Sequence, residues 1–379
     1  MTAPVFITRD PVLNKQRAIV GNRLTLFAAS AALALQELDY LKEHWPAKGS
    51  LFLNFGRLPM TESLASWEMP ANTVLEVDAV WLTQPAGAKV LGILQERNQA
   101  VALYNYQPGQ PVPGGLRVQF VMLDARQHPS PGANPGLAIA TQVADNAEFE
   151  ALLHRGYDGV AGWAFTRREI ANQKLAPGYA QVIRLIDLLR KRADVKEIEA
   201  AFKLDVTLSY KLLRFINSAA FGLASEVTSF RHAVTLLGYD KLYKWLSLLL
   251  VTASKEPIAP VLMQAAVARG RFMESLGKSF FDASELDNLF ITGAFSLLDL
   301  LLDSTMESIL EQMHPPGPIR DALLKREGMY APLLKLATAC EGLPGEMLSA
   351  SKQLGLTPTT VNRAQLEALS FADSLKMAS

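Results

Sequence analysis

The chain has 379 residues, 49% of them hydrophobic, and its 37 lysines and arginines balance its 37 aspartates and glutamates. This length is enough for two or three domains with buried cores. A net charge of zero argues against a nucleic-acid-binding protein, which normally carries a basic excess or a basic stripe.

The cysteine content and the apolar runs bear on the compartment. A single cysteine, Cys340, cannot form an internal disulfide, which is typical of a reducing compartment. The N-terminus lacks the basic and apolar regions of a signal peptide, and no apolar run is long enough to span a bilayer. We therefore expect a cytoplasmic protein with no membrane insertion.

Short apolar runs punctuate roughly the first 170 residues. They are bounded by Gly, Pro, Asn or Asp, and they predict strands at 5–7, 51–55, 74–77, 100–104, 118–123, 137–140 and 159–163. Helices are expected between several of them, for example at 28–43 and 147–155. Alternating strands and helices favour a parallel sheet covered by helices, and seven or eight strands indicate a small, contracted α/β barrel.

From Gly178 onward the apolar spacing becomes helical. Gly222 and Gly238 stand where helices could end. Thr357 and Pro358 are typical of a cap and a first helical residue, which predicts a helix running to about Lys376. We therefore expect an α/β barrel domain at 1–171, a linker at 172–178 and an all-α domain at 179–379.

The strand order of the first half resembles the EAL domain, a barrel that hydrolyses cyclic di-GMP. The resemblance rests on segments 50–54, 74–78, 101–106, 120–124, 140–144 and 159–165. It implies a degenerate, contracted EAL-type (TIM-like) barrel that retains the family's metal-site positions at Asn54, Glu76 and Asp124. The positions at which it implies two aspartates, a Lys, a Glu and a Gln hold Tyr104, Asn105, Met122, Thr141 and Ala161. No acidic residue lies between Asp10 and Glu37, so the glutamate that names the family is missing too.

Phosphodiester hydrolysis of this kind needs two divalent ions held by several carboxylates. Since so few of those positions survive, we expect no enzyme activity, no metal and no cofactor. Cyclic di-GMP binding without cleavage is left open. Its phosphates and guanines would need the cations and rings that follow the predicted strands, namely Arg9, Arg23, Arg57, Arg126, Tyr104 and Tyr106. The alternative interpretation is that these arginines are solvated and that the tyrosines cover the core.

The run 212–222, followed by 229–238, resembles the signature of the HDOD domain, a relative of the HD phosphohydrolases. The resemblance covers about 175–379, with signature residues Asn217, Ser218, Gly222 and Gly238. HD enzymes bind metal through an adjacent His-Asp pair, and no histidine of this chain precedes an Asp. Asn217, a polar residue in an apolar segment, is more simply interpreted as bonding a neighbouring backbone than as contacting a ligand.

The combined resemblance implies a bacterial EAL-HDOD signalling protein. Our first hypothesis is a catalytically inactive adaptor or scaffold that contacts other signalling proteins in a cyclic di-GMP-related pathway controlling motility or biofilm. The alternatives are a non-hydrolysing cyclic di-GMP receptor and a weak cyclic di-GMP phosphodiesterase. A homodimer is also left open, because the barrel family often pairs through its outer helices.

Overall fold

The structure, a computed structural model, describes residues 4–170, 177–204, 217, 227, 230–251 and 258–374. The chain forms two compact units. The barrel unit comprises Met1–Glu169 and Thr338–Leu366, and the helical unit comprises Ile170–Ala337 and Glu367–Ser379. Residues 338–366, which the sequence-based division placed in the helical domain, thus belong to the same compact unit as the barrel. The expected linker, 172–178, overlaps the first helix of the helical unit and otherwise lies outside the described residues.

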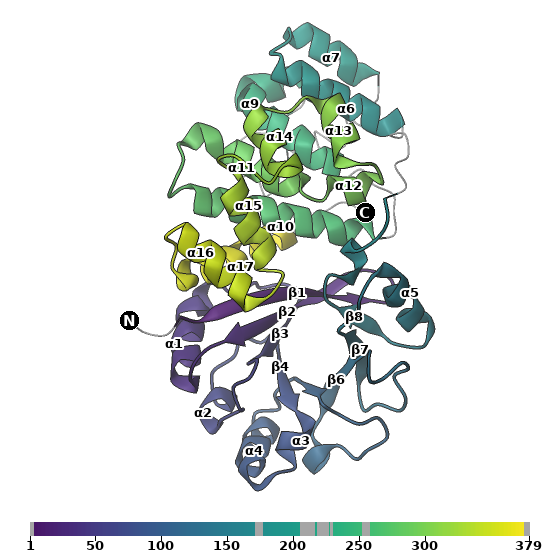
Figure 1. Cartoon of the computed structure of the whole chain (residues 1–379), viewed down its shortest axis with the longest axis vertical. Helices are drawn as coiled ribbons and strands as arrows, with labels where there is room; N and C mark the ends of the chain where they lie inside the picture. Colours follow the sequence, from purple (N-terminus) through teal and green to yellow (C-terminus); the bar gives the residue numbers. More distant parts are fainter. Residues whose placement is uncertain are drawn as a thin grey trace. The chain divides into compact units, whose positions relative to one another are not determined.

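Eight strands close into a barrel in chain order (Figure 1). They are β1 (Phe6–Asn14), β2 (Ile19–Phe27), β3 (Ser50–Asn54), β4 (Thr73–Asp78), β5 (Val101–Tyr104), β6 (Val118–Asp124), β7 (Leu137–Thr141) and β8 (Gly159–Ala161). Strands β2 to β8 run parallel, whereas β1 is antiparallel to both of its neighbours. The parallel sheet expected from the sequence is therefore corrected at β1, because residues 15–18 are too few for a parallel crossover to β2.

Helices on the outside of the barrel connect several of the strands (Figure 1). They are α1 (Ala31–Leu41), α2 (Glu62–Ala65), α3 (Ala79–Leu82), α4 (Ala88–Glu96) and α5 (Asn146–His154). Four of them begin at a polar side chain that accepts a first-turn N–H, supplied by Ser30, Thr61, Asp78 and Asp145. Only the short 3₁₀ turn Pro113–Gly115 lies between β5 and β6, and residues 125–136 join β6 to β7 without a helix. The predicted TIM-like barrel followed by a helical region is confirmed.

The barrel interior is an apolar layer made of one residue from most strands. Its buried members are Val12, Phe52, Val74, Ala102, Met122, Ile139 and Ala161. Gly21 of β2 allows the neighbouring strand to approach closely, since a Cβ there would lie 2.3 Å from the carbonyl oxygen of Ser50. The sequence analysis did not predict β2, whose Asn22 and Arg23 interrupt its apolar pattern.

The outer edge of β1 at residues 5–9 faces no strand, because β1 pairs with β8 only at Val12–Asn14. Side-chain amides from residues 338–366, which we call the C-terminal segment, form hydrogen bonds with this edge instead. Asn362 accepts from the Ile7 N–H at 3.1 Å and donates to the Val5 carbonyl at 2.9 Å. Gln365 donates to the Ile7 carbonyl at 2.9 Å. The edge is thus satisfied without a ninth strand.

Further contacts of residues 338–366 stabilise this attachment. The Arg9 N–H donates to the Cys340 carbonyl, and the buried Arg9 guanidinium donates to Glu341 at 2.9 Å. Asn362 also donates to the buried carboxylate of Glu37 on α1, at 2.8 Å. Burial raises the pKa of the Cys340 thiol. Two helices supply most of this segment, α16 (Pro344–Gln353) and the first part of α17 (Pro358–Ser374).

The helical unit has no strand among its described residues. Its helices are α6 (Pro177–Arg190), α7 (Val195–Lys203), α9 (Phe230–Val251), α10 (Ala259–Gly277), α11 (Ala283–Phe295), α12 (Leu298–Leu302), α13 (Met306–Met313), α14 (Gly317–Leu324) and α15 (Ala331–Ala339). Gly238 interrupts α9 with φ 75°, a backbone conformation that suits glycine. Within the described part of the chain, none of the helices combines the length and the apolar character that a bilayer crossing requires.

Candidate ligand site at the barrel mouth

The barrel interior changes from apolar to polar toward the carboxyl ends of the strands. Side chains two residues apart share one face of a strand. The apolar Phe52 and Val74 are therefore followed, on the same face, by Asn54 and Glu76. This end of an α/β barrel is where ligand sites are usually built.

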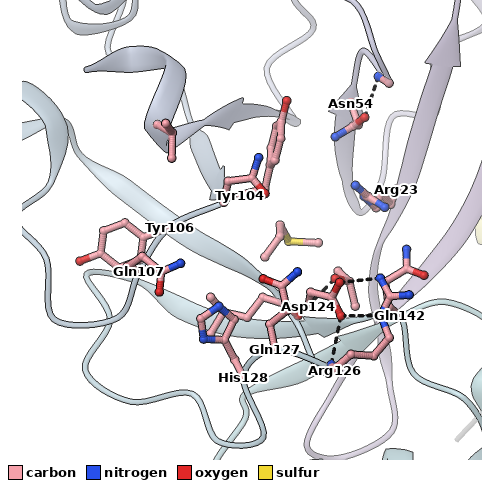
Figure 2. A pocket seen from close by; sticks show the side chains of 16 residues that line it. Arg23, Asn54, Tyr104, Tyr106, Gln107, Asp124, Arg126, Gln127, His128 and Gln142 are labelled. Atoms are coloured by element: carbon pink, nitrogen blue, oxygen red, sulfur yellow. Dashed lines mark hydrogen bonds and ion pairs between the residues drawn. The ribbon is translucent and has the colours of Figure 1, made fainter. Parts of the chain in front are cut away.

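A pocket of about 480 Å³ opens at this end, which we call the barrel mouth. Six of the eight positions selected through the EAL resemblance line it, namely Asn54, Tyr104, Asn105, Met122, Asp124 and Thr141. Figure 2 shows Tyr104, Asn54, Arg23 and Asp124 around the same cavity. The structure does not bring Ala161 to the pocket lining, because it lies in the apolar layer.

Glu76 is central to the polar layer, by which we mean the polar side chains inside the barrel toward the carboxyl ends of its strands. Its side chain is fully buried, and its carboxylate accepts from Arg23 at 2.6 Å through Nε and at 2.8 Å through Nη2. Asn54 donates to the same carboxylate at 2.6 Å. Burial lowers the pKa of Arg23, but the charge and hydrogen bonds of Glu76 outweigh this effect and raise it. Arg23 is therefore a permanent cation in the barrel.

The four arginines selected from the sequence have different positions. Arg23 and Arg126 line the pocket. Arg126 is exposed and forms a two-bond pair with Asp124, which holds the pKa of that carboxyl below its usual value. Arg9 is bonded to Glu341, and Arg57 is not among the lining residues.

Four lining residues with polar side chains were not selected from the sequence: Gln107, Gln127, His128 and Gln142. They lie in the loops after β5, β6 and β7. Gln142 has a positive φ of 59°, and Asn105, which also lines the pocket, has a positive φ of 53°. Their position in the sequence could have identified them, because residues just after the strands of such a barrel face its mouth.

The residues present do not fit a divalent-ion site. Hard cations need several oxygen ligands with free lone pairs. The Glu76 carboxylate already accepts three N–H bonds, and Asp124 is paired with Arg126. Across the described ranges, no three His, Cys, Asp or Glu side chains gather where they could hold a metal ion.

In the helical unit, Asn217 is bonded to the backbone of Val227. It donates to the Val227 carbonyl at 2.8 Å and accepts from the Val227 N–H at 2.7 Å. The other two signature positions before Gly238, Ser218 and Gly222, lie outside the described residues. The Asn217 amide thus links two positions ten residues apart, in keeping with the interpretation that it bonds a neighbouring backbone.

The pKa of Asp10 on β1 depends on the charged side chains of the polar layer and can be tested by its effect on stability. Burial raises its pKa from 3.8 to about 6, while Arg23 and Arg9 oppose the rise and Glu76 and Glu341 reinforce it. Because the folded state holds this proton more tightly than the unfolded state, stability falls as the pH rises from about 4 to about 6. We expect Asp10→Asn to increase the unfolding free energy above pH 6 by about 1–2 kcal/mol, with no difference below about pH 4.

Urea unfolding at several pH values measures this effect. Four of the five tryptophans lie in the barrel unit, so their fluorescence reports mainly on it. Glu96→Gln, a neutralisation of an exposed acid on α4, is the control. A pH-independent difference between Asp10→Asn and the wild type would contradict the assignment.

A family model described as the HDOD domain matches residues 176–312. The chain therefore combines an eight-stranded, TIM-like barrel with a region that matches the HDOD domain.

Known proteins similar to the chain include curated relatives and solved structures. The chain is 30% identical over 207 residues to a cyclic di-GMP phosphodiesterase of Vibrio cholerae, covering 54% of this chain and 48% of that protein. It is 23% identical over 208 residues to an uncharacterized protein of Bacillus subtilis, covering 54% and 51%. The chain therefore spans about half the length of these curated relatives. A structure of the FimX EAL domain from Pseudomonas aeruginosa bound to c-di-GMP is 14% identical with a TM-score of 0.30, covering 42% of this chain and 88% of that one.

The expectation that the chain is not an enzyme is corrected by these comparisons. The Vibrio cholerae relative is named a cyclic di-GMP phosphodiesterase. Our expectation depended on two sets of missing metal ligands, the EAL positions of the barrel and the His-Asp pair of HD enzymes.

Proposed function

We propose that the barrel is of the EAL type, that its mouth binds cyclic di-GMP, and that the chain works in cyclic di-GMP-related signalling. The observation that carries this proposal is the pocket of about 480 Å³, which combines cations with an aromatic ring. The name of the Vibrio cholerae relative supports the choice of ligand.

The chemistry of the lining suits a phosphate ester that carries flat bases. Arg126, at the rim, is held by an exposed pair with Asp124, and such pairs are weak enough to exchange for a ligand phosphate. Tyr104 offers a ring for stacking. Burial, with smaller contributions from Asp78 and Glu76, raises the pKa of its phenol to about 12, so it remains neutral and can donate a hydrogen bond. Tyr106 is buried, and its hydroxyl donates to the Gln110 carbonyl, so it serves as a wall of the pocket.

Titration calorimetry with cyclic di-GMP tests the binding. We expect saturable binding to the wild type and about tenfold weaker binding to Arg126→Gln, because one charge-assisted hydrogen bond to phosphate is lost. Lys89→Gln, which removes an exposed cation from α4, should leave the affinity unchanged. If the wild type gives no saturable heat, the proposed ligand is wrong. If both variants weaken binding equally, the attraction is general rather than located at the mouth.

Hydrolysis of cyclic di-GMP is a second candidate, favoured by the name of the Vibrio cholerae relative. Incubation with Mg²⁺ or Mn²⁺ followed by detection of the linear dinucleotide tests it. Product formation that disappears in Glu76→Ala would support an activity of this barrel. Product formation that survives the substitution would indicate a contaminant.

We also propose that the HDOD domain contributes contacts to other signalling proteins, which the family match supports. Cross-linking of the full chain in bacterial cells, with mass spectrometry of the linked peptides, tests this role. Links from residues 176–312 to another protein, or to a second copy, are expected. Links confined to the barrel unit would contradict it.

A further inference from the structure

The polar layer of the barrel contains acids from two strands that are far apart in sequence. Glu76 of β4 is fully buried, and Asp10 of β1 is electrostatically coupled to it. Asn54 of β3 adds an amide that donates to Glu76. The two acids need a nearby cation when they are ionised, because an uncompensated buried charge is costly.

Arg23 supplies that cation from β2, the strand paired with β1 and β3. Its Nε and Nη2 form two bonds to the two Glu76 oxygens, at 2.6 and 2.8 Å, and Asp10 lies opposite it in the strand register. A carboxylate that accepts this fork together with the Asn54 amide has little lone-pair capacity left for a metal. The guanidinium and a divalent ion therefore compete for the same oxygens.

The remaining guanidinium nitrogen is available to the pocket. Arg23 lines the barrel mouth, and its side chain is 19% exposed. Among the residues that the structure describes, Nη1 has no hydrogen-bond acceptor. Figure 2 shows Arg23 on the pocket wall beside Asn54. An anionic oxygen in the mouth would find two N–H donors and a permanent charge at that position.

We propose that Arg23 serves as a built-in cation in place of a divalent ion: it neutralises Asp10 and Glu76, and it offers Nη1 to an anionic ligand group of the phosphate-ester class. The neutralising role is independent of the proposed function, and only the identity of the ligand depends on it. Metal-free ligand binding at the mouth follows directly.

Thermal unfolding of the full chain with EDTA or with MnCl₂ tests the neutralising role. The wild type and Arg23→Lys, which keeps the charge, should melt at the same temperature in both solutions. Arg23→Gln removes the cation bonded to Glu76 and leaves Asp10 with Arg9 alone, so it should melt lower in EDTA. It should regain several degrees at about 1 mM Mn²⁺, as mass action gives for a site of about 10 µM affinity.

The double variant Arg23→Gln/Glu76→Gln is the matched control and should be insensitive to manganese. If Arg23→Gln does not fold in EDTA, folding in Mn²⁺ alone supports the proposal, and failure in both solutions contradicts it. Manganese binding by the wild type, measured by electron paramagnetic resonance and lost in Glu76→Gln, would overturn it. So would an equal response of the Lys and Gln variants.

Calorimetry with cyclic di-GMP in EDTA separates this inference from the proposed function. Equal wild-type affinity in EDTA and in Mg²⁺, together with a loss of more than about tenfold in Arg23→Lys, supports the role of Nη1. Binding that requires Mg²⁺ overturns it. If the wild type does not bind cyclic di-GMP at all, the proposed function fails, while the manganese measurements still decide whether Arg23 replaces a metal.

Discussion

Asn362→Ala is expected to lower the unfolding free energy of the barrel unit by about 3 kcal/mol, because buried groups that lose their partners cost about 1–3 kcal/mol each. The substitution removes the acceptor of the Ile7 N–H and the donor to the Val5 carbonyl and to the Glu37 carboxylate. It would also reopen the edge of β1, at which no strand is paired over residues 5–9. Urea unfolding followed by tryptophan fluorescence measures the loss.

Gln353→Ala provides the control, since Gln353 is exposed on α16 in the same C-terminal segment. Its effect should stay within about 0.5 kcal/mol. Hydrogen exchange adds a local measurement: Asn362→Ala should accelerate exchange at Ile7, while amides of β4 and β5 remain protected. If Asn362→Ala is as mild as the control, the C-terminal segment does not stabilise β1.

Lys244→Met is expected to destabilise the helical unit by about 3 kcal/mol, the lower end of the range for removing one partner of a buried ion pair. The buried Lys244 ammonium lies 2.5 Å from the Glu274 carboxylate and 2.7 Å from that of Asp287. It also stands over the Phe290 ring, 4.4 Å from its centroid. Without it, two carboxylates on α10 and α11 lose their common cation, although Glu274 keeps its bond to Arg271.

Hydrogen exchange of peptides from α10 and α11 gives a readout specific to this unit. The triple variant Lys244→Met/Glu274→Gln/Asp287→Asn should recover part of the loss, because it removes the uncompensated acids. Lys325→Met, which breaks an exposed pair with Asp321, should change little. Equal protection in Lys244→Met and Lys325→Met would refute the expectation.

Most of the barrel was predictable from local patterns. Parallel strands buried on both faces are short apolar runs, and such runs at 51–55, 74–77 and 118–123 mark β3, β4 and β6. The prediction failed at β2, where Asn22 and Arg23 are polar yet belong to a paired strand. Arg23 is favourable there because Glu76 of β4, across the barrel interior, supplies its partner.

The site was predictable in part. Resemblance to the EAL domain pointed to Asn54 and Asp124, and both line the pocket. The pairing of Arg23 with Glu76 was not predictable, since 53 residues separate them and no local pattern links a lone arginine to a distant acid. The pocket glutamines were missed for a related reason. They lie in loops, and they reach the pocket only because those loops follow strands that end at the barrel mouth.

Local sequence patterns sufficed for the α/β and all-α character of the two parts and for the start of α17 at Pro358; at Gly238, where a helix end was expected, the helical backbone is interrupted. These features depend on spacing, capping and backbone preference within a few residues. The attachment of residues 338–366 to β1, the antiparallel entry of that strand and the Arg23–Glu76 pair required the folded molecule. Each of them depends on segments far apart in the sequence, and it is favourable because the folded chain supplies hydrogen-bonding or charged partners to groups that would be costly to bury alone.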